Sequence, residues 1–291
     1  MQPDSEPTQE LIVKRDHLLN VMRGFPGVAV AFSGGVDSTV VAKAAVLALG
    51  SSAVAVTSES PSVPRSELED ARRLAEIIGI RHVIVSTTEF ANPDYAKNSR
   101  DRCYFCKSEL YSRIESLLPE LGVPVICSGA NLDDLGDYRP GLTAAAEHAV
   151  RHPLQEAKFT KADVRALAAA WGLPNADKPA SPCLSSRLSP GLAVTPERTR
   201  RVEEAEAYLK RLGLSDCRVR YHEGDLARVE VPVEYLSRFT DATVRTALTT
   251  EFRRLGFKFI TLDLEGFRTG SLNALVSLEV RNRFSTVSKS G

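Results

Sequence analysis

The sequence has no excess of charge of either sign and no long apolar run. In a chain of 291 residues, 37 Lys and Arg residues balance 37 Asp and Glu residues. A basic excess is usual in proteins that bind nucleic acid, so this balance argues against that class. No apolar stretch is long enough to cross a bilayer, and the polar residues 1–10 carry no secretory signal. We therefore expect a cytoplasmic protein that binds neither nucleic acid nor a membrane.

Cysteine is also scarce, with five residues in the chain. In the cytoplasm these thiols are expected to be reduced side chains, metal ligands or nucleophiles, and not a disulfide framework. Core-forming residues are plentiful, since 43% of the residues are hydrophobic and 25% are charged. This composition is typical of a globular protein with one large domain or two ordinary ones.

Short apolar runs alternate with helical patterns in the first part of the chain. The predicted strands and helices, in chain order, are strand 28–32, helix 39–49, strand 53–57, helix 65–78, strand 82–86, helix 106–118 and strand 123–128. Such alternation indicates βαβ units and a parallel sheet covered on both faces. The predicted fold class is therefore α/β, with a first domain at residues 1–180.

Prolines gather after Leu173 and interrupt this pattern. They predict a Cys- and Pro-rich linker loop at residues 181–195. Beyond the loop, the pattern changes to a helix at 196–212, strands at 217–222 and 226–231, a further helical region and a last strand at 257–264. Residues 196–291 are therefore predicted to form a smaller α+β domain.

The sharpest motif is a glycine-rich turn between strand 28–32 and the helix that follows it. The turn consists of Ser33, Gly34, Gly35, Val36, Asp37 and Ser38. Glycines let the backbone approach phosphate closely, and the amides of a helix N-terminus face an anion. An aspartate beside phosphates implies a divalent cation between them, here Mg²⁺. An ordinary turn with Asp37 as a helix cap is the competing interpretation, which the strand–turn–helix context disfavours.

This turn resembles the PP-loop of N-type ATP pyrophosphatases, which cleave ATP to AMP and pyrophosphate. A Walker loop would need a lysine where Val36 stands. Gly129, in a Ser-Gly-Ala-Asn stretch followed by two aspartates, resembles the second nucleotide motif of the same superfamily. The resemblance also implies that Thr57 and Ser58, after the second strand, lie near the adenine.

Three cysteines lie in polar motifs. Cys103 and Cys106 are part of Arg-Cys-Tyr-Phe-Cys-Lys, and Cys183 is part of Pro-Cys-Leu-Ser-Ser-Arg. A Cys-x-x-Cys pair puts two thiolates within reach of one metal or cluster, and Cys183 can complete a three-thiolate site. Helix residues without a ligand, or a redox-active pair, are the alternatives for Cys103 and Cys106. Cys127 and Cys217 are predicted to be core residues.

A basic strand and a polar ending lie in the predicted second domain. Arg218 and Arg220 alternate along a strand and therefore share a face, where two guanidinium groups suit a phosphate or a carboxylate. The alternative is a solvated face with cross-strand partners such as Glu230. Residues 262–273 are dense in polar residues and glycine, and they form either a functional loop or a turn that packs the domains together.

Together, the motifs resemble the LarE family, the sulfur transferases that build the pyridinium dithiocarboxylate nickel-pincer cofactor, over most of the chain. The resemblance implies an enzyme that adenylates a carboxylate of pyridinium-3,5-biscarboxylic acid mononucleotide, releases pyrophosphate and then AMP, and inserts sulfur. It implies ATP and Mg²⁺ as cofactors. It also implies that Arg187, Arg218 and Arg220 hold the phosphate of this small-molecule substrate.

Members of this family differ in their sulfur source. Some sacrifice the cysteine at the position of Cys183 and leave dehydroalanine. Others carry three cysteines, which match Cys103, Cys106 and Cys183 and are thought to hold a [4Fe–4S] cluster that passes on a bound sulfide. The three-cysteine pattern favours the iron–sulfur route, with Cys183 as the catalytic residue.

We further expect a homo-oligomer that works with other enzymes of nickel-pincer cofactor biosynthesis. A tRNA-thiolating or amidating PP-loop enzyme and a non-catalytic nucleotide-binding protein are the alternatives. The tRNA-thiolating enzyme would be expected to carry a basic RNA-binding module or zinc ribbon, and the amidating enzyme a glutaminase segment. Neither is visible in the sequence.

Overall fold

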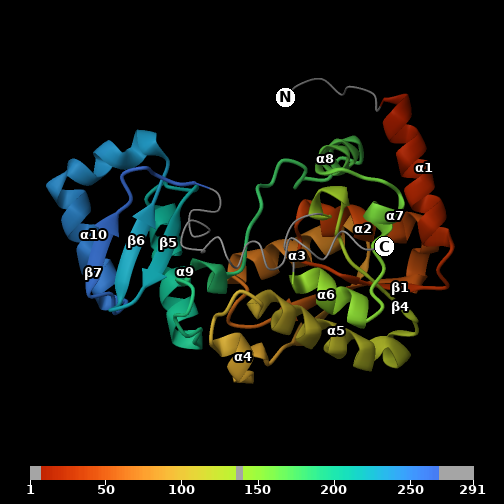
Figure 1. Ribbon diagram of the computed structural model, residues 1–291. Helices are drawn as coiled ribbons and strands as arrows, with labels where there is room; N and C mark the ends of the chain where they lie inside the picture. The colour runs from red at the N-terminus through yellow and green to blue at the C-terminus, as the bar shows by residue number, and fades with distance from the viewer. Residues whose placement is uncertain (1–7, 136–139, 269–291) are drawn as a thin grey trace. The chain divides into compact units, whose positions relative to one another are not determined.

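The structure, a computed structural model, describes residues 8–135 and 140–268 (Figure 1). Its contacts divide the chain into two compact units. The first unit contains residues 8–88 and 103–181, and the second contains residues 89–102 and 182–268. The sequence predicts two domains that each occupy one continuous stretch of the chain, with a linker at residues 181–195 between them. The segment 89–102 instead packs with the second unit, which no local pattern in its sequence indicates.

A four-stranded parallel sheet forms the centre of the first unit. Its strands are β1 (Val28–Ala31), β2 (Ala53–Glu59), β3 (Arg81–Ser86) and β4 (Val125–Cys127). They lie in the order β3-β2-β1-β4, and Val30 of β1 is in register with Ala55 of β2 and Cys127 of β4. The predicted α/β class with a parallel sheet is therefore confirmed.

Helices cover both faces of this sheet because its strands are apolar on both sides. One core cluster contains Val28 and Val30 and side chains of the helices α1 (Gln9–Arg23), α2 (Val36–Leu49), α3 (Arg65–Ile78) and α8 (Lys161–Ala170). The other contains Ala29 and side chains of α5 (Arg102–Leu121) and α6 (Pro140–Glu147). Figure 1 shows α1, α2 and α8 on one side of the sheet and α5 and α6 on the other.

Two of the observed helices begin earlier in the chain than the sequence predicts. The helix α2 begins at Val36 and α5 at Arg102, so both include motif residues that were predicted to precede a helix. Helices α1 and α8 were not predicted, although both carry local signals. Thr8 caps α1, and Thr160 forms a capping box with Asp163 at the start of α8. The remaining short elements are α4 (Pro93–Ala96), α7 (Pro153–Glu156), η1 (Gly50–Ser52), η2 (Glu89–Ala91), η3 (Leu132–Asp134), η4 (Leu184–Arg187) and η5 (Val233–Thr240).

The second unit contains a three-stranded sheet and two longer helices. The strands β5 (Arg218–His222) and β6 (Leu226–Glu230) form an antiparallel hairpin, and β7 (Phe259–Leu262) pairs parallel to β6. The helices are α9 (Pro196–Arg211) and α10 (Ala242–Arg254). Val219, Tyr221, Ala227 and Val229 are buried on one face of the sheet, which leaves the arginines of β5 and β6 on the other. None of the helices in the described part of the chain combines the length and apolar character needed to cross a bilayer.

Candidate functional site

The glycine-rich turn joins the carboxyl end of β1 to the N-terminus of α2. Gly35 is the N-cap residue of α2, and no side chain caps this end. The first N–H groups of a helix have no partner inside the helix, so they are available to an anion. The strand β1 also lies between β2 and β4, where the order of the sheet reverses, and open α/β sheets bind ligands at that position.

Hydroxyl groups and one glycine set the shape of the turn. Ser38 Oγ donates to the Gly35 carbonyl at 3.0 Å and accepts from Ser33 N at 3.2 Å. Gly34 has a φ of 71°, and a Cβ at this position would lie 3.2 Å from the Cα of Ala71. Positive φ and close packing both require glycine there.

The second nucleotide motif packs directly against this turn. A Cβ on Gly129 would lie 2.7 Å from Ser38 N and 2.9 Å from the carbonyl carbon of Asp37. Asn131 Nδ2 donates to Asp37 Oδ1 at 3.0 Å. The structure therefore brings the predicted residues of loop 33–38 and Gly129 together at one edge of the sheet.

Lys161 is a further charged residue of this site, and sequence reasoning missed it. Its ammonium is hydrogen bonded to Asp37 Oδ2, and its backbone N–H donates to Asp133 Oδ2 at 2.8 Å. Lys161 is the first residue of α8, whose capping box is visible in the sequence. That box predicts the helix start, but no local signal predicts the contact with Asp37, 124 residues away.

The predicted strand 53–57 includes Thr57 and ends there, whereas β2 continues to Glu59, so Ser58 also lies within the strand and not after it. Thr57 is buried, and its hydroxyl donates to the Phe32 carbonyl at 2.7 Å. The hydroxyl oxygen is also 2.7 Å from His82 Nε2, and burial lowers the pKa of His82. The Thr57 hydroxyl therefore anchors Phe32, the residue that directly precedes the glycine-rich turn.

A half-buried histidine, His152, contacts the start of the other motif. His152 Nδ1 lies 2.8 Å from Ser128 Oγ, and Ser128 Oγ accepts from Ala130 N at 3.4 Å. Burial lowers the pKa of His152, so the neutral imidazole is favoured. Sequence reasoning did not single out His152.

The cysteines separate into buried and accessible thiols. Cys127 and Cys217 are fully buried, and burial raises the pKa of each thiol to about 12. Their prediction as core residues is confirmed. Cys103 is exposed and Cys106 is half-buried, and both lie in the first turns of α5. Cys183 is half-buried and is the N-cap of η4 in the second unit. Within residues 8–135 and 140–268, no three His, Cys, Asp or Glu side chains are grouped as metal ligands.

Several side chains of the second unit hold the segment around Cys183. Arg102, the residue before Cys103, donates to the Ser185 carbonyl at 2.9 Å. Tyr95 Oη lies 2.7 Å from Ser185 Oγ. The Cys183 carbonyl accepts from Arg187 Nη1 at 3.0 Å and from Ser186 Oγ at 2.6 Å. The backbone at Cys183 is therefore fixed by its own motif.

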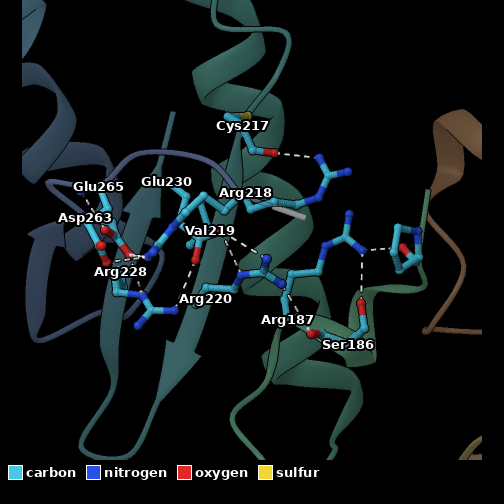
Figure 2. A network of polar contacts seen from close by, with 12 residues as sticks. Ser186, Arg187, Cys217, Arg218, Val219, Arg220, Arg228, Glu230, Asp263 and Glu265 are labelled. Atoms are coloured by element: carbon cyan, nitrogen blue, oxygen red, sulfur yellow. Dashed lines mark hydrogen bonds and ion pairs between the residues drawn. The ribbon is translucent and has the colours of Figure 1, made fainter. Parts of the chain in front are cut away.

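Figure 2 shows that the three predicted phosphate-binding arginines differ in their partners. Arg187 is 2% exposed and pairs with Glu206 at 3.1 Å, and Arg220 is 7% exposed and pairs with Glu230 at 3.0 Å. The alternative was a solvated face with cross-strand partners such as Glu230. Its cross-strand pairing is confirmed for Arg220, whereas the solvated face is wrong there, because that side chain is buried.

Arg218 makes no ion pair with a carboxylate among the described residues. It donates to the Cys217 carbonyl at 2.7 Å and stacks 5.0 Å from the centroid of the Phe267 ring. Burial and the neighbouring positive charge of Arg187 lower the pKa of Arg218. A half-buried guanidinium without a direct carboxylate partner among the described residues is suited to bind an anion.

The described part of the polar ending forms a turn packed on the second unit. Gly266 has a φ of 74°, and a Cβ there would lie 2.9 Å from the Val231 carbonyl oxygen. Phe267 N donates to the same carbonyl at 2.8 Å. Residues 262–268 therefore form a turn that packs within the second unit, and the remainder of this motif lies outside the described residues.

Comparisons with known proteins agree with this geometry. The family profile described as NAD synthase matches residues 16–117. An uncharacterised protein of Synechocystis sp., slr1717, is 48% identical over 85% of this chain and 92% of its own length. Pyridinium-3,5-bisthiocarboxylic acid mononucleotide synthase of Lactiplantibacillus plantarum is 39% identical over 90% of this chain and 95% of its own length. A tRNA-specific 2-thiouridylase of Cereibacter sphaeroides is 30% identical over 57% of this chain and 55% of its own length.

The parallel sheet, the uncapped glycine-rich turn and the NAD synthase match define an ATP-using protein with a PP-loop domain. Similarity to the mononucleotide synthase over nearly the full length of both chains narrows the assignment. This chain belongs to the LarE family of ATP-dependent sulfur transferases. It is therefore an enzyme with a small-molecule substrate.

Proposed function

We propose that this enzyme uses ATP to activate a carboxylate of pyridinium-3,5-biscarboxylic acid mononucleotide and then installs sulfur there. The similarity to a synthase named for the dithio product supports this substrate. The observation that carries the proposal is the close approach of Gly129 to the N-terminus of α2. This contact supports one anion-binding site built from two motifs that lie far apart in the sequence. The proposed ATP-binding residues are Ser33, Gly34, Gly35, Val36, Asp37, Ser38, Thr57, Ser58 and Gly129.

Adenylation solves a chemical problem, because a carboxylate is a poor acyl donor. A carboxylate oxygen attacks the α-phosphorus of ATP, the bond to the bridging oxygen breaks, and pyrophosphate leaves with the bonding electrons. The N–H groups at the start of α2 and the ammonium of Lys161 offset the charge on pyrophosphate. A sulfur nucleophile then adds to the acyl carbon and AMP departs.

Mg²⁺ is the cation that we propose beside Asp37. A carboxylate suits this ion, which prefers oxygen ligands and supplies neutralising charge to pyrophosphate. Both Asp37 oxygens are engaged in the structure, one by Asn131 and the other by Lys161. Asp37 would hold Mg²⁺ once the Lys161 ammonium turns to a phosphate oxygen. The carboxylate–ammonium pair therefore keeps both groups in place for Mg-ATP.

Among the three arginines, Arg218 is the residue that we propose contacts the substrate phosphate directly. Buried glutamates already compensate the charges of Arg187 and Arg220. Those two arginines therefore position the Cys183 segment and β5, whereas Arg218 has charge available for an anion. A contact between its guanidinium and phosphate would be charge-assisted and bidentate.

For the sulfur source, we propose that Cys103, Cys106 and Cys183 hold an iron–sulfur cluster. Cysteine thiolates are the usual ligands of such clusters, and three of them leave one iron without a protein ligand. The cluster would supply sulfide. In the alternative, Cys183 alone gives up its sulfur.

Asp37→Asn tests the ATP chemistry, because it removes the charge that would hold Mg²⁺ and keeps the side-chain shape. We expect pyrophosphate release from Mg-ATP and the pyridinium substrate to fall by about a hundredfold or more, with the circular dichroism spectrum unchanged. Asp16→Asn, at an exposed carboxylate of α1, is the control and should release pyrophosphate normally. A normal rate in Asp37→Asn would contradict the loop assignment. Release that requires tRNA in place of the pyridinium substrate would favour a thiolating enzyme.

The homo-oligomer, the Mg²⁺ requirement and the work alongside other cofactor-synthesis enzymes in the cytoplasm also stand as proposals. Light scattering behind size-exclusion chromatography tests the first. Pyrophosphate release in the presence of a chelator, with and without added Mg²⁺, tests the second.

A further inference from the structure

Asn175 joins the loop after α8 to the glycine-rich turn. Its side chain is 6% exposed. Its amide nitrogen donates to the Gly34 carbonyl at 3.0 Å and to Thr39 Oγ1 at 2.9 Å. Both acceptors lie more than a hundred residues earlier in the chain, one on each side of the N-terminus of α2. Both hydrogens of the amide are thus used on this turn.

These two hydrogen bonds orient successive peptide groups. A trans peptide is planar, and its C=O and N–H point in opposite directions. The bond to the Gly34 carbonyl therefore turns the Gly35 N–H away from Asn175. Thr39 Oγ1 accepts from Asn175 and donates to the Gly35 carbonyl at 2.9 Å, which turns the Val36 N–H away in the same manner.

The Gly35 N–H is accordingly available for a ligand. Its hydrogen bond in the structure, to Ser33 Oγ, is 3.3 Å long and lies beyond the usual range. A phosphate oxygen would be a better acceptor, because hydrogen bonds to ionised groups are shorter and stronger.

The amide oxygen of Asn175 makes an unfavourable contribution to stability. Asn175 Oδ1 is buried and has no hydrogen-bond partner in the described structure. A buried unpaired acceptor is unfavourable, and a leucine would fill a similar volume without that penalty. The stabilising contribution of Asn175 therefore comes from its amide nitrogen, whose acceptors belong to the turn and to the first turn of α2.

We propose that Asn175 is a positioning residue that orients the turn for the pyrophosphate part of ATP and leaves binding of the AMP part unaffected. This inference rests on the ATP chemistry proposed above. Asn175 acts through Gly34 and Thr39 without touching the nucleotide.

Asn175→Leu removes the donor and retains the side-chain volume. Binding of Mg-pyrophosphate and of AMP is measured separately by titration calorimetry on the full-length protein. We expect the affinity for pyrophosphate to fall by about tenfold, because a charged ligand loses oriented donors. The affinity for AMP should change less than about twofold.

Two further variants separate positioning from loss of structure. Arg165→Met removes hydrogen bonds to the Ala176 and Lys178 carbonyls at 2.8 and 3.1 Å, which anchor the same loop without contacting the turn. It should bind pyrophosphate as the wild type does. Thr39→Val interrupts the same chain of hydrogen bonds, so adding it to Asn175→Leu should weaken pyrophosphate binding little further.

The proposal is overturned if Asn175→Leu binds pyrophosphate normally, if AMP binding weakens equally, or if Arg165→Met reproduces the loss. A wild-type protein that binds neither Mg-ATP nor pyrophosphate would refute the proposed function itself. The two failures are therefore distinguishable.

Discussion

Arg218 and Arg220 lie on the same face of β5, but replacing them with alanine should change different properties. Arg220→Ala should lower the free energy of unfolding, and Arg218→Ala should raise the KM for the pyridinium substrate. Arg220 is paired with Glu230, which is completely buried and also contacts Arg228 at 3.0 Å. Removing one partner of a buried pair typically costs about 3–5 kcal/mol. Because Arg228 remains, we expect Arg220→Ala to lower the free energy of unfolding by about 3 kcal/mol.

Arg218→Ala should leave stability nearly unchanged. The guanidinium has no carboxylate partner among the described residues, and burial together with Arg187 lowers its pKa. A basic group whose pKa is lower in the folded than in the unfolded state has its charged form disfavoured by folding, so removing that charge is not costly. A lost charge-assisted contact with substrate phosphate is worth about 1.5–3 kcal/mol. We therefore expect the KM for the pyridinium substrate to rise about ten- to a hundredfold.

Urea unfolding and steady-state pyrophosphate release measure the two quantities on the same samples. The KM for ATP should be unchanged in Arg218→Ala, since we assign that side chain to the substrate phosphate and not to ATP. An unaltered KM for the pyridinium substrate in Arg218→Ala would refute the phosphate assignment. Equal destabilisation by the two substitutions would refute the argument from their partners.

Three other outcomes are expected. Gly129→Ala should abolish pyrophosphate release, because its Cβ would lie 2.7 Å from Ser38 N, and a folded variant with normal turnover would contradict this packing. If the iron–sulfur proposal is correct, protein reconstituted with iron and sulfide should turn over repeatedly when sulfide is supplied. Replacing Cys103, Cys106 or Cys183 with serine should then weaken its charge-transfer absorption. Dehydroalanine at Cys183 with no iron bound would favour the sacrificial route. Burial lowers the pKa of His152, so the unfolded state takes up its proton first as the pH falls below about 6.5, and stability is lost there. The melting temperature of His152→Gln should therefore depend less on pH over this range than that of the wild type.

The strand, turn and α2 were predictable because their signals are local. The apolar run before Ser33 and the glycines that follow specify a buried strand and a turn that approaches anions, whatever the rest of the chain does. The burial of Cys127 was predictable for the same reason, since it lies in an apolar strand. The helix α8 has a local capping box that also predicts its start.

Which groups the charged and polar side chains of the site contact was decided only by the tertiary structure. The alternation of Arg218 and Arg220 indicates a shared face, but their different roles depend on strand register and on which carboxylates are buried beside them. Glu230 lies directly opposite Arg218 in the hairpin and yet pairs with Arg220. Lys161 and Asn175 reach the glycine-rich turn from 124 and 141 residues away. Hydrophobic period and glycine geometry act between neighbours in the chain, whereas these contacts exist only after the sheet and its helices have packed.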